Sequence, residues 1–374
     1  MAELPIVVVG AGFAGVAAAW AVAEAGARAL VISARAGSSE LYSGMLDGPS
    51  PARDVRALAH ALGLLTSAEP RAIATREGMV RRVHGRDAAL LDLEAVAGHT
   101  VAVADIARDE WDAELLARSY AASEWARGTN TSFRAVKIEA LNTGAERRIS
   151  AFDFARLFDA PARAVALGQA LAAATGGAAA WLLGPWLGVE TNACEAVSSA
   201  AGQPVGETAS ALGGAAGARF AARRAALFAS RRIESQTRVV RAIEATASGP
   251  LVVLLEDGER VLASSVVVAV GGVAGGGIAL GPARLTLSLA LPARLELDGD
   301  VLDGASWLSG PSFQRQGLRA LESLGVAVDH QLAIAPNSRV FACGDALAAQ
   351  PRNAFAALSS GIAAGRSALA RAAG

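Results

Sequence analysis

The sequence predicts an α/β protein in which a Rossmann-like nucleotide-binding domain is discontinuous and carries an inserted second domain. A glycine-rich turn follows an apolar strand near the N-terminus, and a short strand ending in Gly344-Asp345 lies near the C-terminus. The region between them has a different pattern, and 374 residues suffice for two domains. We expect the nucleotide-binding domain to take residues 1–50, 217–282 and 335–374, and the insert to take 51–216 and 283–334.

Composition indicates a folded protein with a large core. Hydrophobic residues make up 53% of the chain, charged residues 18%, and 40 residues are glycine. These values exclude a disordered chain and are typical of alanine-rich helices around buried strands. The net charge is −1 and no basic block occurs, so we expect no nucleic-acid partner.

Cysteine usage and hydropathy bear on the compartment. Cys194 and Cys343 lie far apart and have no metal-ligand or C-x-x-C spacing, so the sequence predicts neither a metal site nor a disulfide and favours a cytoplasmic protein. The N-terminus carries no basic region typical of a signal peptide. The charge-free stretch 164–189 approaches the ~20 residues of a membrane span. Glycines and a proline interrupt it, so we expect a helix, a strand and a loop instead of a transmembrane segment.

The first motif lies at the N-terminus, where an apolar strand from Ile6 leads into Gly10-Ala-Gly12-Phe-Ala-Gly15 and an alanine-rich helix. A second strand follows at Ala29 to Ile32. In this context Gly10 permits the tight turn, Gly12 lets the backbone approach a pyrophosphate, and Gly15 allows close packing of helix on strand. Unpaired N–H groups and the positive end of the helix then favour a dinucleotide.

The acidic residue that usually binds the adenosine ribose is missing at the end of the second strand. Ser33 stands in its place, followed by Ala34 and Arg35. We expect Ser33 to make a weaker ribose contact and Arg35 to be a solvated charge. The alternative is that Arg35 contacts a phosphate, as in NADP sites.

The second half of the predicted site begins with an Arg-rich helix at Gly217–Ser230. Three strands follow, joined in part by an Asp257-Gly258 hairpin turn, and then a strand that ends in Gly271-Gly272. The strand from Ser338 ends in Gly344-Asp345 and precedes a helix at about 356–372. In FAD-dependent two-domain oxidoreductases such an aspartate binds the ribityl hydroxyls, and the last helix directs its positive end at the flavin. The alternative for Asp345 is a turn or helix-capping aspartate.

Several segments resemble one family. Leu41-Tyr-Ser43-Gly44-Met-Leu-Asp47, Ser132–Val136, Phe154–Asp159 and Val267–Gly277 are similar to segments of the B subunit of the anaerobic glycerol-3-phosphate dehydrogenase complex, a relative of fumarate reductase flavoproteins. The resemblance implies an FAD-binding subunit of a hetero-oligomeric, quinone-linked dehydrogenase, with peripheral membrane association through its partner. Segments 210–217, 349–353 and 359–361 differ from the family pattern, so the substrate is left open.

We therefore predict an FAD-dependent oxidoreductase or electron-transfer subunit that binds FAD non-covalently. The predicted cofactor contacts are Gly10, Gly12, Gly15, Ser33, Ser43, Gly44, Gly271 and Asp345. Two alternatives are a structural or assembly subunit that retains the fold without catalysis, and an NADP-binding reductase.

Catalytic residues are less clearly indicated. His330 follows Asp329 before the final strand, and an Asp-His pair could relay a proton, although a surface turn is the commoner position. Arg352 and Asn353 lie between Asp345 and the last helix and are the best candidates for binding an anion. The resemblance adds Arg134, as a clamp for an anionic substrate or as an interface ion pair.

Overall fold

The structure is a computed structural model that describes residues 4–34, 37–174, 177–245, 249–281, 285–302, 308 and 310–373. The chain forms two compact units. Unit 1 comprises Met1–Ser39, Ala52–Leu58 and Arg224–Gly374, and unit 2 comprises Glu40–Pro51 and Ala59–Arg223. The fold is thus α/β, with a discontinuous first unit and an inserted second one.

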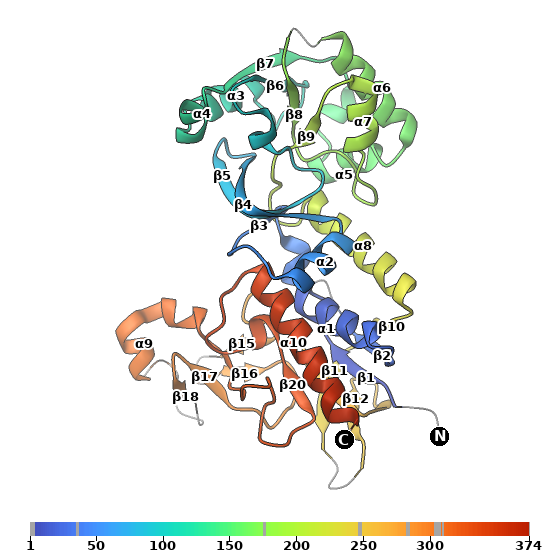
Figure 1. The fold of residues 1–374 in the computed structure, drawn as a ribbon, viewed down its shortest axis with the longest axis vertical. Helices are drawn as coiled ribbons and strands as arrows, with labels where there is room; N and C mark the ends of the chain where they lie inside the picture. The colour runs from blue at the N-terminus through green and yellow to red at the C-terminus, as the bar shows by residue number, and fades with distance from the viewer. Residues whose placement is uncertain are drawn as a thin grey trace. The chain divides into compact units, whose positions relative to one another are not determined.

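A five-stranded parallel sheet forms the centre of unit 1, with strand order β10-β2-β1-β14-β20. Each neighbouring pair is parallel, so the carboxyl ends of these strands share one edge. Figure 1 shows that strands from both ends of the chain lie side by side in this sheet. The strands are β1 (Ile6–Val9), β2 (Ala29–Ile32), β10 (Glu234–Gln236), β14 (Ser265–Val268) and β20 (Val340–Ala342).

Helices α1 (Phe13–Glu24) and α10 (Ala354–Ala373) lie side by side against this sheet (Figure 1). Glycine permits their close approach, because a Cβ at Gly361 would lie 2.2 Å from the Ala14 carbonyl oxygen. At Gly365 a Cβ would lie 2.6 Å from the Ala18 carbonyl oxygen. The predicted helix 356–372 is confirmed, and its glycines set the distance between the two helices.

The predicted three-stranded meander packs with the other face of the sheet. Strands β11 (Val240–Glu244), β12 (Leu251–Leu255) and β13 (Arg260–Ala263) are antiparallel. Alternate strand residues such as Val7 and Val9 share a hydrophobic core with Val253 of this meander. Because successive side chains of a strand point to opposite faces, Val7 and Val9 lie on one face of β1, and this face packs against the meander.

Residues 283–334 were expected in the insert, but those of them that the structure describes belong to unit 1. Leu295, Leu297 and Val326 are buried in the same core as β1 and β14, which accounts for this grouping. The remaining elements of unit 1 include η1 (Ser38–Leu41), at its boundary, β15 (Ile278–Leu280), β16 (Leu285–Leu287), β17 (Leu295–Leu297), β18 (Asp300–Val301), α9 (Pro311–Gln316), η5 (Gly317–Glu322), β19 (Gly325–Val326) and η6 (Gly344–Ala346).

Unit 2 contains a parallel sheet of its own, with order β7-β6-β8-β9. Its strands are β6 (Thr100–Asp105), β7 (Ser132–Lys137), β8 (Ala180–Leu183) and β9 (Val205–Glu207). A second, antiparallel sheet comprises β3 (Met45–Leu46), β5 (Val80–Asp87) and β4 (Leu64–Ala74). The other elements are η2 (Leu93–Val96), α3 (Ala113–Ala121), α4 (Glu124–Thr129), η3 (Gly144–Arg147), α5 (Ala151–Leu157), α6 (Pro161–Ala173) and α7 (Cys194–Ala201). The division between the units falls within α2 (Arg53–Ala61) and α8 (Ala215–Arg231).

The charge-free stretch 164–189 contains part of α6, the strand β8 and a following loop, as predicted. In the part of the chain that the structure describes, no helix has both the length and the apolar character needed to cross a membrane.

Candidate cofactor site

The candidate site lies at the carboxyl edge of the unit 1 sheet. Gly10 follows β1, Ser33 follows β2, Gly271 comes shortly after β14, and Asp345 lies just beyond β20. In open α/β sheets ligands bind outside the carboxyl ends of the strands. The parallel pairing therefore places four of the predicted cofactor residues at the edge where a dinucleotide is expected.

Two glycines of the first motif are required by the fold itself. Gly10 has φ +110°, and a Cβ there would lie 2.3 Å from the Ala269 carbonyl oxygen. A Cβ at Gly15 would lie 2.0 Å from the Gly10 carbonyl oxygen. Both separations are far below van der Waals contact, so neither position accepts a side chain without backbone displacement.

Gly12 is different, because the nearest atom to a Cβ at this position belongs to a serine hydroxyl. That Cβ would lie 2.9 Å from Ser39 Oγ. Ser39 Oγ in turn accepts a hydrogen bond from the Phe13 amide at 2.9 Å, in the first turn of α1. A phosphate oxygen can replace a hydroxyl as acceptor at a helix N-terminus, and no acidic side chain in this turn would repel it.

Sequence reasoning missed Ser39 and its neighbour Ser38. A Cβ at Gly275, in the glycine-rich loop after β14, would lie 3.6 Å from Ser38 Oγ. The two hydroxyls thus lie near both glycine-rich segments of unit 1. The available signal was the Gly37-Ser38-Ser39 run just after β2, where small polar residues follow the strand that precedes a ribose site.

The position after β2 has a neighbour that the sequence did not indicate. The Ser33 amide donates to the Gln236 carbonyl oxygen at 3.0 Å, because β10 lies beside β2. Among the described residues, Gln236 Oε1 is one of the buried side-chain atoms that lack a hydrogen-bond partner. Buried acceptors are normally paired, so this amide oxygen fits an absent donor such as a ribose hydroxyl or an adenine amino group. Arg35, the NADP candidate, lies outside the described residues.

Asp345 is held between the second glycine loop and the start of α10. A Cβ at Gly272 would lie 2.6 Å from the Asp345 carbonyl oxygen, and one at Gly344 would lie 2.6 Å from Ala14 Cβ in α1. The Gly344 amide donates to Ser360 Oγ at 3.0 Å. Partial burial raises the pKa of the Asp345 carboxyl, while the positive charge of Arg352 opposes this shift.

Arg352 is committed to backbone carbonyl groups. Its guanidinium donates to the carbonyl oxygens of Glu322 at 2.9 Å, Asp345 at 2.7 Å, and Leu324. Burial lowers the pKa of Arg352, and the nearby Asp345 raises it. These contacts support a role in holding the segment after β20, and binding of an anion by Arg352 stays a prediction.

Asn353 and His330 also have local structural roles. Asn353 Oδ1 accepts from the Ala356 amide at 2.9 Å and so caps the N-terminus of α10. His330 is exposed in a turn where Asp329 Oδ1 accepts from the backbone amides of Gln331 at 2.8 Å and Ala333 at 2.9 Å. The Asp329 carboxylate thus stabilises the turn, and a proton relay through His330 stays a prediction.

The remaining predicted residues lie in unit 2. Ser210 donates its amide to the Ser43 carbonyl oxygen at 2.9 Å, and Asp87 donates its amide to the Gly44 carbonyl oxygen at 2.7 Å. Both residues therefore have structural partners within unit 2, and their contact with a cofactor stays a prediction. Arg134 is exposed on β7, an edge strand of the parallel sheet.

A second polar cluster, here called the Arg219 network, is buried inside unit 2. Arg219 Nε donates to Asp87 Oδ1 at 3.2 Å and Arg219 NH2 to Glu207 Oε2 at 2.7 Å, while NH1 donates to the Gly188 carbonyl oxygen. Tyr42 donates its hydroxyl to Asp87 Oδ2 at 3.2 Å. Burial raises the pKa of Glu207, against the effect of Arg219. The partners are internal, which is typical of a structural network.

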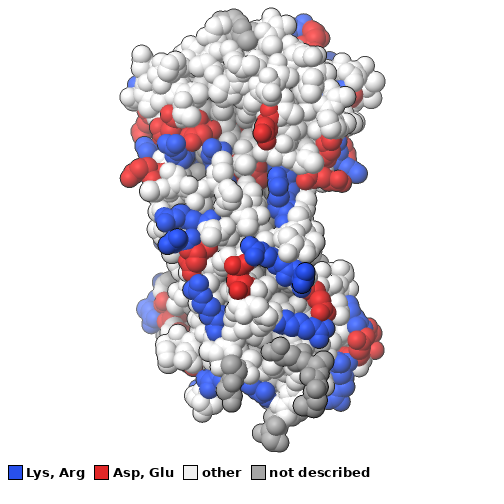
Figure 2. Space-filling view, turned by 45° about the vertical axis from the view of Figure 1, so that its right-hand side comes forward, with Lys and Arg blue, Asp and Glu red and all other residues white. Residues whose placement is uncertain are grey.

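Other candidate chemistry is limited. Among the described residues no group of three or more His, Cys, Asp and Glu could hold a metal ion. Cys194 and Cys343 are buried free thiols, and burial raises the pKa of Cys343 to about 12. On the face drawn in Figure 2, acidic and basic side chains form small mixed groups.

Comparison with known proteins supports the cofactor. Residues 5–110 match the family described as an FAD binding domain. The glycine turn, the acceptor at Gln236 and the carboxyl at Asp345 fit this dinucleotide, and FAD is the cofactor that the match indicates. No curated protein matches the sequence.

Solved structures to which the chain is similar include a GidA-related protein from Thermus thermophilus, with 12% identity, a TM-score of 0.38 and 99% coverage of both chains. An oxidoreductase from Agrobacterium tumefaciens has 14% identity, a TM-score of 0.27 and 98% coverage of both chains. A putrescine oxidase variant has 15% identity, a TM-score of 0.34 and 99% coverage of both chains. Similarity at this level does not extend to activity.

Proposed function

We propose that the chain is an FAD-dependent oxidoreductase whose cofactor binds at the carboxyl edge of the unit 1 sheet. The observation that carries the proposal is the convergence at this edge of the α1 N-terminus, the Gly271-Gly272 loop and Asp345. These groups come from opposite ends of the chain and suit the phosphate and ribityl parts of one dinucleotide. The bound flavin would supply the acceptor for a hydride or for electrons.

Each end of the cofactor has protein groups that suit it. The α1 N-terminus, with no side chain at Gly12, would bind the pyrophosphate. The Phe13 amide would then donate to a phosphate oxygen in place of Ser39 Oγ, or to both acceptors. Ser33 and Gln236 would bind the adenosine end, where Gln236 Oε1 is a ready acceptor. Asp345 would accept from ribityl hydroxyls, and the positive end of α10 would stabilise negative charge near the flavin pyrimidine.

The absorption spectrum of the purified protein tests this function. Flavin bands near ~370 and ~450 nm are properties of the ring itself, and they should disappear on anaerobic reduction. Acid or heat precipitation should release the flavin into solution, because the binding is non-covalent. A colourless protein that takes up no added FAD would contradict the proposal, and a flavin that stays with the precipitate would contradict non-covalent binding.

We further propose that the chain works as a subunit of a dehydrogenase. The sequence segments that resemble the B subunit of the anaerobic glycerol-3-phosphate dehydrogenase complex support this, together with 53% hydrophobic and 18% charged residues. Such a composition favours an interface with another subunit. That partner subunit would attach the complex to the cytoplasmic face of a membrane. Light scattering and dye reduction, with and without neighbouring gene products, would test it. A monomer that oxidises a small hydroxy acid unaided would contradict the subunit role.

A second candidate function is a structural subunit that retains the fold but lacks catalysis. The observation in its favour is that Arg352, Asn353 and Asp329 all bind backbone groups. Anaerobic reduction by the complex separates the two functions, since the flavin of a structural subunit would remain oxidised during turnover. An NADP-binding reductase would instead require Arg35 at a phosphate, and NADPH alone should then reduce the flavin.

A further inference from the structure

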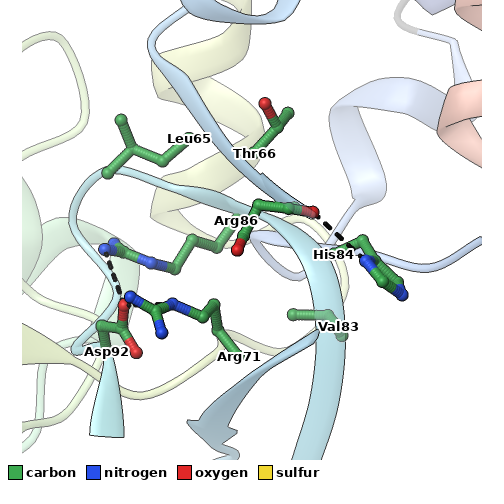
Figure 3. A pocket seen from close by; sticks show the side chains of 9 residues that line it. Leu65, Thr66, Arg71, Val83, His84, Arg86 and Asp92 are labelled. Atoms are coloured by element: carbon green, nitrogen blue, oxygen red, sulfur yellow. Dashed lines mark hydrogen bonds and ion pairs between the residues drawn. The ribbon is translucent and has the colours of Figure 1, made fainter. Parts of the chain in front are cut away.

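A cavity of about 170 Å³ lies in unit 2 between strands β4 and β5 (Figure 3). The two strands pair regularly as far as Thr66 opposite Gly85, and pairing resumes at Arg71 opposite Val83. Five steps along β4 (66 to 71) thus correspond to two along β5 (85 to 83). The extra residues leave the ladder, and such bulges redirect side chains. The cavity is a consequence of this irregular pairing.

Two guanidinium groups and one carboxylate line this cavity. Arg71 Nε lies 3.0 Å from Asp92 Oδ2, and Arg86 NH2 lies 3.7 Å from the same oxygen. Figure 3 shows both arginine side chains reaching the aspartate from the two strands. Burial lowers the pKa of Arg86, the carboxylate of Asp92 opposes this shift, and the positive charge of Arg71 adds to it. Two positive charges therefore share one negative charge.

The positions of these groups are fixed by backbone contacts. Arg86 NH1 donates to the Leu90 carbonyl oxygen at 2.8 Å, and Asp92 Oδ1 accepts from the Glu94 amide at 3.1 Å. The side chains of Arg86 and Asp92 are 15% and 12% exposed, whereas that of Arg71 is 41% exposed. A ligand would thus meet one largely covered guanidinium group, that of Arg86, and a more accessible one, that of Arg71.

His84 also lines the cavity, on the side away from the two guanidinium groups (Figure 3). Its Nδ1 lies 3.2 Å from the Ser67 carbonyl oxygen, so Nδ1 carries the proton because a carbonyl oxygen can only accept. The other ring nitrogen can accept a hydrogen bond in the neutral ring or donate one in the charged ring. It can therefore bind either a protonated or an ionised oxygen.

We propose that this cavity binds a small oxyanion, phosphate or carboxylate, free or as the anionic end of a larger molecule, at the guanidinium groups of Arg71 and Arg86. Guanidinium groups favour such planar or tetrahedral oxyanions through charge-assisted hydrogen bonds. The volume exceeds the ~30 Å³ share of one water and is below the ~300–1,000 Å³ of pockets for drug-sized ligands. The proposal goes beyond the cofactor function and does not depend on it.

The test measures anion binding to the full-length protein by calorimetry and thermal shift. Inorganic phosphate and acetate are titrated separately, with sodium chloride at equal ionic strength as the reference. We expect at least one oxyanion to stabilise the protein beyond chloride. Binding of phosphate alone, acetate alone or both supports the site and identifies the ligand chemistry. No effect beyond that of chloride for either would overturn the proposal.

Substitutions of the lining arginines test whether the anion binds in this cavity. Arg71→Gln should weaken it about tenfold or more, as expected for loss of a charge-assisted hydrogen bond. Arg82→Gln is the matched control, because Arg82 lies on the same strand as Arg86 but pairs with Glu94 outside the lining. Arg86→Gln should act like Arg71→Gln, and if it fails to fold, Arg71→Gln alone decides. Phosphate bound at the α1 N-terminus would survive Arg71→Gln, and that result would overturn the proposal.

Nuclear magnetic resonance of the histidine rings gives independent evidence for where the anion binds. The chain has four histidines, so the ring signals of His84 can be assigned by comparison with His84→Asn. Titration with the bound oxyanion should shift the His84 signals in the wild type and leave them in place in Arg71→Gln. Binding that shifts only the other histidines would contradict the proposed site.

Discussion

The carboxyl edge of the unit 1 sheet and the Arg219 network of unit 2 differ in how far their polar side chains are paired within the protein. In the network, Arg219 donates to two carboxylates and a carbonyl, and those carboxylates accept further bonds from Tyr42 and the backbone. At the edge, Gln236 Oε1 is buried and has no hydrogen-bond partner among the described residues, and the Asp345 carboxyl has a raised pKa because it is partly buried.

The difference separates a structural from a binding role. A buried polar network with satisfied partners stabilises one conformation, whereas an unpaired buried acceptor costs free energy until a ligand supplies its donor. Gln236, at the carboxyl edge, is thus a candidate cofactor contact, whereas the paired charges of the network are not. Substitutions in the network should reduce stability, and those at the edge should reduce FAD affinity.

The largest effect is expected for Arg219→Met. Removing the guanidinium leaves Asp87 and Glu207 buried without their counter-ion, and breaking a buried pair in this way costs about 3–5 kcal/mol. Chemical denaturation should show a lower free energy of unfolding. A loss below about 1 kcal/mol would mean that the network is not a structural element.

Substitutions at Gly15 and at Gly12 of the first motif should have different effects. Gly15→Ala places a Cβ 2.0 Å from a carbonyl oxygen and should destabilise the protein by about 1–3 kcal/mol or more. Gly12→Ala displaces only Ser39 Oγ and should leave a folded protein that binds FAD poorly. Denaturation curves and FAD titration of the apo-proteins measure both. Equal loss of stability in the two variants would remove the distinction.

Asp345→Asn should weaken FAD binding by about ten- to hundredfold, since a hydrogen bond to a charged group contributes ~1.5–3 kcal/mol. The same variant should stabilise the apo-protein at neutral pH. The folded-state pKa is raised, so ionisation of Asp345 disfavours the folded state. Protonated Asp345 therefore contributes to the free energy of unfolding. This contribution is fully present below the unfolded-state pKa of ~3.9 and is lost as the pH rises through the folded-state pKa.

Thermal unfolding measured from pH 7 toward pH 4 tests whether ionised Asp345 destabilises the folded apo-protein. The advantage of Asp345→Asn over the wild-type apo-protein should shrink as the pH falls and Asp345 becomes protonated. An advantage that grows on acidification would show that the carboxylate stabilises the apo-protein, and Asp345 would then resemble the carboxylates of the Arg219 network.

The smallest effect is expected for Gln236→Leu. Replacing a buried acceptor that has no partner in the described part of the chain with an apolar side chain of similar size should leave the apo-protein equally stable or slightly more stable. FAD affinity should fall by a factor of about three to ten, as expected for one neutral hydrogen bond of ~0.5–1.5 kcal/mol. Titration of the apo-protein measures it. Unchanged affinity would show that Gln236 does not contact the cofactor.

Local patterns in the sequence were enough to predict much of unit 1. The Gly10–Gly15 turn, the meander and the C-terminal helix each follow from short-range signals, namely strand-end glycines, an Asp-Gly turn and helical periodicity. Strand β10 was not predicted because Glu234-Ser235-Gln236 has no apolar period, and Gln236 was therefore missed.

Features that depend on long-range packing could not be predicted. Asp87, Glu207 and Arg219 are far apart in the sequence, and their charges carry no local sign of a shared site. Residues 283–334 join unit 1 because their apolar side chains complete its core, which local patterns do not reveal. The commitment of Arg352 to backbone carbonyls likewise depends on the position of residues 322–324.

The central claim is that FAD binds where the α1 N-terminus meets the carboxyl edge of the unit 1 sheet. Its most direct test is the FAD content per chain of the purified wild type and of Gly12→Val, measured from the flavin absorbance. Gly128→Ala serves as control, because no surrounding atom of the described residues lies within 4 Å of a Cβ placed there. We expect stoichiometric FAD in the wild type and the control, and a folded Gly12→Val protein without flavin. Gly12→Val purified with one FAD per chain would contradict it.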